Sequence, residues 1–178
     1  MHVIRAKFWV YQHSGIMLML LVAITGAGLF FVHGSTGTFA VTTVGAILSL
    51  AYFLQKQKLD EIRLFKELFV DFNRRYEDLN KKLATVKDPE IERPLTPDEM
   101  QTLVAYFNLC AEEYLFQRRG YIHPDAWKAW RIGMRDIFGL PRIREFWKRE
   151  SGGTDSYYGL EQEIRILLED TAKLGPAG

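Results

Sequence analysis

The chain has few residues that carry chemistry, and it has no charged residue between Phe8 and Gln55. Its single cysteine, Cys110, excludes an intrachain disulfide and any metal cluster built from cysteines. The four histidines are scattered: His2, His13, His33 and His123. The motifs GxGxxG, GxxxxGK[ST], HExxH and GxSxG are all absent. The sequence therefore predicts no catalytic residues, no cofactor site and no metal site.

Two apolar runs fill the uncharged stretch. Residues 14–32 read SGIMLMLLVAITGAGLFFV, residues 39–54 read FAVTTVGAILSLAYFL, and the link between them is HGSTGT. A helix that crosses a membrane needs about 20 largely apolar residues. We therefore expect residues 1–55 to be a membrane anchor, with a two-helix transmembrane hairpin over about 14–33 and 36–55.

Basic residues lie at the two outer ends of this hairpin and are absent from the link between its helices. Arg5 and Lys7 precede the first run, Lys56 and Lys58 follow the second, and the link carries neither lysine nor arginine. Because lysine and arginine stay preferentially on the cytoplasmic side, this pattern places both termini in the cytoplasm. The predicted location is the bacterial inner (plasma) membrane.

Residues 56–178 are predicted to form an all-α cytoplasmic domain. We expect helices over about 56–86, 97–119, 124–138, 141–150 and 158–173, the first of them a long juxtamembrane helix. Thr96, Pro97 and Glu99 have the spacing of a capping box with proline at the first helical position. No segment shows the alternation of a half-buried strand, so the fold class is a helical bundle behind a membrane hairpin.

A heptad pattern runs along the first of these helices. Large apolar residues recur at alternating spacings of three and four: Ile62, Phe65, Phe69, Phe72, Tyr76, Leu79, Leu83 and Val86. The seam either packs against other helices of the same chain or pairs two copies in a homodimer. Phenylalanine is bulky for a two-stranded coiled coil, which favours the bundle, but both interpretations stay open.

Charge is divided between two neighbouring segments. Residues 88–113 hold seven acidic residues and one base, Arg93, whereas residues 118–149 hold nine basic and three acidic residues. The candidate interaction surface consists of the arginines of the basic segment and one lysine: Arg118, Arg119, Arg131, Arg135, Arg142, Arg144, Lys148 and Arg149. The two blocks pair with each other inside one fold, or the basic one binds a protein partner or anionic lipid. Nucleic acid is the disfavoured partner, although aromatics are interleaved with the bases.

Adjacent carboxylates on one helix form a second candidate site. Glu112 and Glu113 point about 100° apart on a helix, so they do not converge on one atom. They either pair with arginines of the basic segment or lie in a pocket of an enzyme or small-ligand receptor. The candidate pocket residues are Glu112, Glu113, Tyr114, Trp127, Trp130 and Tyr158.

Several segments resemble a scattered group of uncharacterised bacterial helical proteins. They are LFKELFVDFNRRYEDLNKKL (64–83), LTPDEMQTLVAYFNLCAEEYLF (95–116), GYIHPDAWKAWRIGMRDIF (120–138) and SYYG (156–159). The resemblance covers about residues 60–160 and implies a bacterial all-helical cytoplasmic module, without any activity or site to transfer. The predicted function is a membrane-anchored interaction or adaptor module that binds a protein partner.

Overall fold

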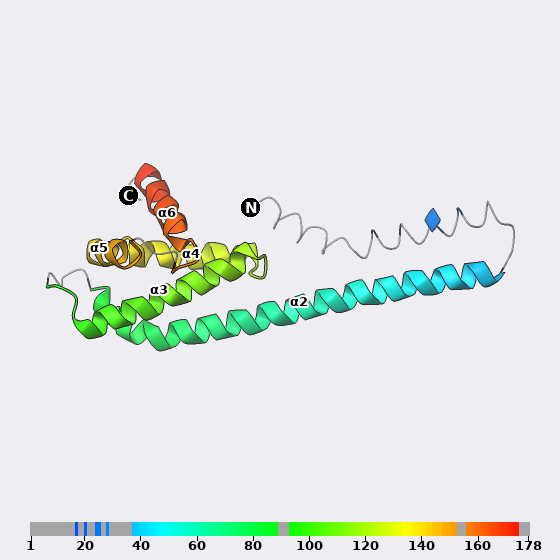
Figure 1. Cartoon of the computed structure of the whole chain (residues 1–178), viewed down its shortest axis with the longest axis horizontal. Helices are drawn as coiled ribbons and strands as arrows, with labels where there is room; N and C mark the ends of the chain where they lie inside the picture. The colour runs from blue at the N-terminus through cyan, green and yellow to red at the C-terminus, as the bar shows by residue number, and fades with distance from the viewer. Residues whose placement is uncertain are drawn as a thin grey trace. The chain divides into compact units, whose positions relative to one another are not determined.

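The computed structural model describes residues 37–88, 93–152 and 156–174, together with Met17, Leu20, Ile24, Thr25 and Gly28. Helices dominate these ranges, and no strand occurs within them, so the all-helical class is confirmed. In chain order the helices are α2 (Gly37–Val86), α3 (Pro97–Arg118), α4 (Pro124–Phe138), α5 (Pro141–Glu150) and α6 (Leu160–Leu174) (Figure 1).

Local sequence explains where three of these helices begin. Proline is the first residue of α3, α4 and α5, where its missing N–H costs no helical hydrogen bond. Thr96 caps α3 in a complete capping box, because its hydroxyl accepts from the Glu99 N–H while the Glu99 carboxylate accepts from the Thr96 N–H. His123 caps α4 by accepting from the Asp125 N–H.

The chain divides into two compact units, Met1–Leu64 and Phe65–Gly178, and the boundary falls inside α2. In the first unit, large apolar residues of α2 are exposed: Val44, Leu48, Leu50, Tyr52, Phe53, Leu54, Leu59 and Ile62. The buried hydrophobic core described below belongs to the second unit.

No described helix is both long enough and apolar enough to cross a membrane. The predicted transmembrane hairpin is therefore wrong, and so is the inner-membrane location inferred from it. Most of the first predicted span, 14–33, lies outside the described residues. Within the described part of α2, Lys56 ends the uncharged stretch, and charged residues follow it along the rest of the helix.

Aromatic side chains make the centre of the second unit. Phe107 of α3 is fully buried, and its ring centroid lies 4.8 Å from Trp147 and 5.1 Å from Phe138. The Tyr157 ring packs against Trp147, with centroids 4.9 Å apart, and lies 6.5 Å from Phe107. Edge-to-face and offset pairs of this kind add about 0.5–1.5 kcal/mol each beyond the burial of their surface.

The heptad residues of α2 pack inside the same chain. Phe72, Leu83 and Val86 are buried in the core, and Phe65, Tyr76 and Leu79 pack against it. The intramolecular alternative therefore accounts for most of the seam. Ile62 and Phe69 remain exposed, and a homodimer through this seam stays a prediction.

Candidate functional site

Glu112 is held by an arginine from another helix. Arg75 of α2 donates from Nη1 to Oε2 at 2.6 Å and from Nη2 to Oε1 at 3.0 Å, the two-bond geometry that suits guanidinium and carboxylate. The hydrogen bond to Glu112 raises the pKa of Arg75 above its usual value. Glu112 therefore forms an ion pair, as one of the two alternatives predicted. Its partner is Arg75, whereas the sequence suggested an arginine of the basic segment 118–149.

Glu113 is in the opposite situation. It is 7% exposed, and its carboxylate accepts no hydrogen bond from any residue that the structure describes. Burial raises the pKa of Glu113 to about 8, although the charge of Arg75 lowers it and that of Glu112 raises it further. A carboxyl group with this pKa is largely protonated at neutral pH, so it is a poor metal ligand and not an anionic base there.

Cys110 lies one turn before these carboxylates and is unsuited to nucleophilic chemistry. The side chain is buried, and burial raises the pKa of its thiol well above the usual value, with the nearby Glu113 raising it further. A nucleophilic cysteine needs the thiolate and access to substrate. Cys110 therefore acts as a small apolar core residue.

The aromatic residues of the predicted pocket separate into two groups. Tyr114 packs beside Trp127 with centroids 5.9 Å apart, and Arg118 lies 5.6 Å over the Tyr114 ring. Arg118 also donates from Nη1 to the carbonyl of Tyr158 at 3.1 Å. Trp130 instead stacks on Phe69 of α2 at 5.8 Å. Among the described residues, these ring contacts link Tyr114 to Trp127 and Trp130 to Phe69, and they do not join the two groups around Glu112 and Glu113.

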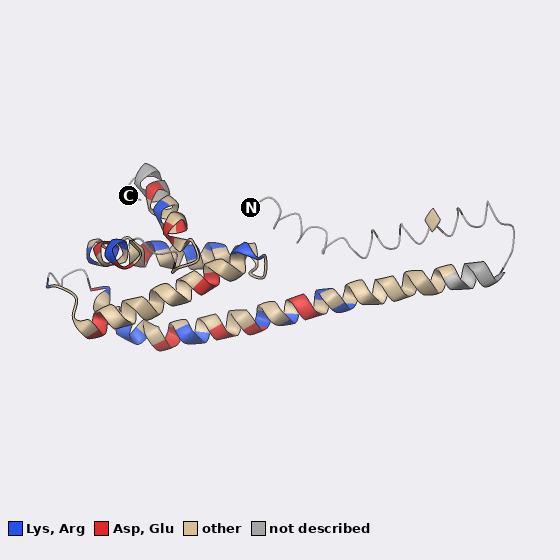
Figure 2. Cartoon of the chain, viewed as in Figure 1, with Lys and Arg blue, Asp and Glu red and all other residues tan. Residues whose placement is uncertain are grey.

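Several arginines of the basic segment form ion pairs or hydrogen bonds with other residues of the protein. Arg131 pairs with Glu163 at 2.8 Å and Arg135 with Asp136 at 3.0 Å. Arg144 donates from Nη2 to the carbonyl of Gly139, which ends α4. Figure 2 shows the distribution of charged residues along the helices.

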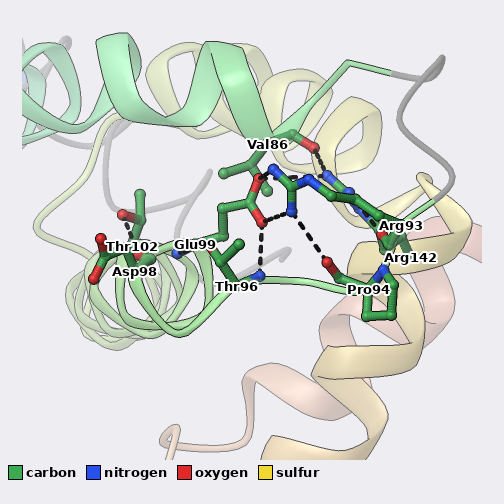
Figure 3. Close-up of polar contacts among 8 residues, drawn as sticks. All are labelled: Val86, Arg93, Pro94, Thr96, Asp98, Glu99, Thr102 and Arg142. Carbon is green, nitrogen blue, oxygen red and sulfur yellow. Dashed lines mark hydrogen bonds and ion pairs between the residues drawn. The ribbon is translucent and has the colours of Figure 1, made fainter.

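The two charge blocks meet at one cluster, Arg93, Glu99 and Arg142 (Figure 3). Arg93 donates two hydrogen bonds to Glu99, at 2.7 and 3.0 Å. Arg142 donates to the carbonyls of Val86 and Arg93, and its Nη2 lies 4.0 Å from Glu99 Oε1. These contacts tie the end of α2 to the starts of α3 and α5, so the cluster is structural.

Hydrogen bonding makes Glu99 strongly acidic. The bonds from Arg93, and then those from Thr96, lower its pKa to about 2 against an opposing effect of burial. The capping box was visible in the sequence, but its connection to Arg93 and Arg142 was not. Only the tertiary fold brings Arg142 within reach of the last turn of α2.

Described residues of the second unit line three surface grooves, among others that the unit can have outside the described ranges. One of about 1010 Å³ is lined by the end of α2 and the start of α5, including Lys87, Arg142 and Phe146. Another, of about 600 Å³, lies between α2 and α3 and includes Lys82 and Asp98. The third, of about 550 Å³, lies between α5 and α6. None of the three is lined by Glu112 or Glu113.

Within the described ranges, no group of three histidine, cysteine, aspartate or glutamate side chains could hold a metal ion. No protein-family model, curated protein or solved structure matches the chain. The resemblance to bacterial helical proteins therefore stays a prediction.

Proposed function

We propose that this chain is a helical interaction module that binds a protein partner through the cationic surface of α5. The observation that carries the proposal is the state of the α5 cations. Arg144, Lys148 and Arg149 are exposed, and no carboxylate of the described residues lies within ion-pair distance of them. Uncompensated charge on a rigid helix steers association and selects a partner of opposite charge.

The α5 helix is rigid because its other face is part of the core. Ile143, Phe146 and Trp147 are buried, and the Phe146 ring also carries Arg149 at 5.6 Å from its centroid. Arg144 is oriented by its bond to Gly139. A partner that binds this surface meets two arginines, Arg144 and Arg149, whose side chains already make intramolecular contacts, which lowers the entropic cost of binding.

An enzymatic function has less support. Arg75 occupies the Glu112 carboxylate, Glu113 is buried and protonated at neutral pH, and Cys110 is buried as a thiol. A nucleophile, base and electrophilic group within reach of one another would be needed to argue a reaction class. The residues in question do not provide that arrangement.

Binding of single-stranded RNA is also less well supported. Such binding uses aromatic rings whose faces are open to stack on bases. Four of the six aromatic residues of the basic segment are buried, since Trp127 is 6% exposed, Phe138 0%, Phe146 6% and Trp147 4%. Trp130 is half-buried and stacks on Phe69, and Tyr121 is 36% exposed. The role of the four buried rings is to fill the core.

Site-specific photocrosslinking tests the proposal on the full chain. A photoreactive residue replaces Lys148 on α5, and in a matched control it replaces Lys128, an exposed lysine of α4 in the same basic segment. We expect a discrete protein adduct from position 148 that disappears when Arg144 and Arg149 are changed to glutamate. Equal adducts from both positions, or none from position 148, would contradict the proposal.

A further inference from the structure

We propose that the groove between α5 and α6 binds an acidic amphipathic helix of the partner. The proposal rests on the proposed function and identifies the part of the cationic surface that recognises the partner. The floor of the groove is apolar, with Trp147 4% exposed, Ile164 1% exposed and Leu168 half-buried. Two helices that flank an apolar floor present the ridges against which a third helix packs.

The α5 rim of the groove is cationic, whereas the α6 rim carries Arg165 between Glu161 and Glu169. Arg144 and Lys148 lie one turn apart on α5, and Arg165 lies on α6. None of the three has a carboxylate of the described residues within ion-pair distance. An occupant that places acidic residues on the edge that faces α5 would pair with Arg144 and Lys148 while its apolar face covers the floor.

One acceptor in the groove also lacks a donor. Oε1 of Glu161, a lining residue on α6, is buried and accepts no hydrogen bond within the described part of the chain. A buried carboxylate oxygen without a donor costs free energy, which a bound donor would recover. We therefore expect the partner helix to carry one N–H donor, such as an indole or a side-chain amide, on the edge that faces Glu161.

Other occupants fit the charge less well. Residues 171–178 of this chain, TAKLGPAG, carry one charged side chain, that of Lys173, which the rim cations would repel. The phosphates of nucleic acid would lie beside Glu161 and Glu169 on α6 as well as beside the cations of α5, whereas a helix can confine its carboxylates to the α5 edge. The Trp147 ring is packed edge-on against Phe107 and Phe138, which leaves it unsuited to stack on a base.

Two synthetic peptides and two charge-matched variants test the groove. The first peptide is an amphipathic helix with leucine and one tryptophan on one face and glutamate on the other, and the second carries lysine in place of every glutamate. Fluorescence anisotropy measures their binding to the full chain. We expect the acidic peptide to bind, the basic peptide not to bind, and added salt to weaken the complex.

The groove variant is Arg144→Glu/Lys148→Glu/Arg165→Glu. The control, Arg119→Glu/Lys128→Glu/Arg135→Glu, changes the net charge by the same amount at residues that do not line the groove. We expect the groove variant to bind the acidic peptide at least about tenfold more weakly than the native chain, and the control to stay within about twofold. Circular dichroism melting curves verify that both variants fold.

The outcomes separate the groove from the proposed function. The groove proposal is wrong if the acidic peptide does not bind, or if both variants weaken its binding equally. It is also wrong if the basic peptide or a single-stranded RNA 20-mer binds in preference to the acidic peptide. If the chain with the photoreactive residue at position 148 still gives the adduct when Arg165, the groove cation on α6, is changed to glutamate, the groove is wrong and the interaction module stands. If position 148 of the otherwise native chain gives no adduct, the proposed function itself fails.

Discussion

Arg75 on α2 and Glu112 on α3 form a two-bond ion pair, with nitrogen to oxygen distances of 2.6 and 3.0 Å. The two residues are 37 positions apart in the sequence. The same guanidinium lies 3.7 Å from Asp71 and 5.9 Å from the centroid of the Phe72 ring. Contacts with residues of α2 therefore help to orient Arg75 toward α3. The pair therefore fixes the register between the second half of α2 and α3.

A double-mutant cycle with Arg75→Ala and Glu112→Gln measures this pair. Both side chains are about one third exposed, so solvent screens their attraction. We expect a coupling free energy of about 1 kcal/mol or less from urea unfolding, reduced further by high salt. Additive effects of the two changes would show that the pair contributes nothing to stability.

Glu113 makes stability depend on pH in the opposite direction from a normal surface carboxylate. Its pKa is about 8 in the folded chain and about 4.5 when unfolded. Between these values the folded state holds a proton that the unfolded state has lost, so stability falls as pH rises from about 4.5 to about 8. We expect Glu113→Gln to remove this fall, by an amount on the order of a few kcal/mol.

Unfolding in urea at pH 5 and at pH 8 tests the effect. Glu112→Gln is the matched control, since Glu112 is the adjacent residue and is partly exposed. The expected gain for Glu113→Gln over the native chain is larger at pH 8 than at pH 5. An equal difference at both pH values would show that Glu113 titrates normally.

Local patterns in the sequence were sufficient for much of the fold. The starts of α3, α4 and α5 follow from Pro97, Pro124 and Pro141, each preceded by an extended residue. The heptad spacing identified Phe72, Leu83 and Val86 as core residues of α2. These features depend on interactions within a turn or two of helix, which the sequence displays directly.

The membrane hairpin and the site could not be read in the same way. Hydropathy shows that the segment from Phe39 to Leu54 is apolar. It does not show where the helix that contains this segment begins, or how long the apolar part of that helix is. The partner of Glu112 was missed because Arg75 comes from another helix, and the approach of Arg142 to Glu99 was missed for the same reason. Pairing between helices depends on how the helices are aligned with each other, and this alignment cannot be predicted from the residues that neighbour either partner in the sequence.

Glu99 stabilises the chain against acid. Its pKa is about 2 in the folded chain and about 4.5 when unfolded, so its contribution is complete above pH 4.5 and is lost as pH falls toward 2. We expect Glu99→Gln to have a lower free energy of unfolding than the native chain at pH 7. We also expect its free energy of unfolding to fall less than that of the native chain between pH 4.5 and pH 2. Thr96→Ala, which removes the cap and one of the interactions that lower the pKa of Glu99, should cost about 1 kcal/mol at pH 7 and less at pH 3. A pH-independent loss for Glu99→Gln would contradict the assignment.

Phe107 is the side chain on which the core depends most. It is fully buried and contacts the rings of Phe138 and Trp147. We expect Phe107→Ala to destabilise the chain by roughly 3–5 kcal/mol, because it loses buried surface and leaves a cavity. Ile132→Ala on the exposed face of α4 should cost less than about 0.5 kcal/mol. Comparable losses in the two variants, measured by urea unfolding, would contradict this account of the core.

Cys110 reports on the opening of α3. Its thiol is 1% exposed and has a raised pKa, so an aromatic disulfide reagent can reach it as a thiolate only when the helix separates from its neighbours. We expect slow labelling of the folded chain and prompt labelling in urea. The control is Cys110→Ala/Gln101→Cys, which moves the thiol to an exposed position of the same helix. Labelling of Cys110 as fast as that of the relocated thiol would show that the centre of α3 is open to solvent.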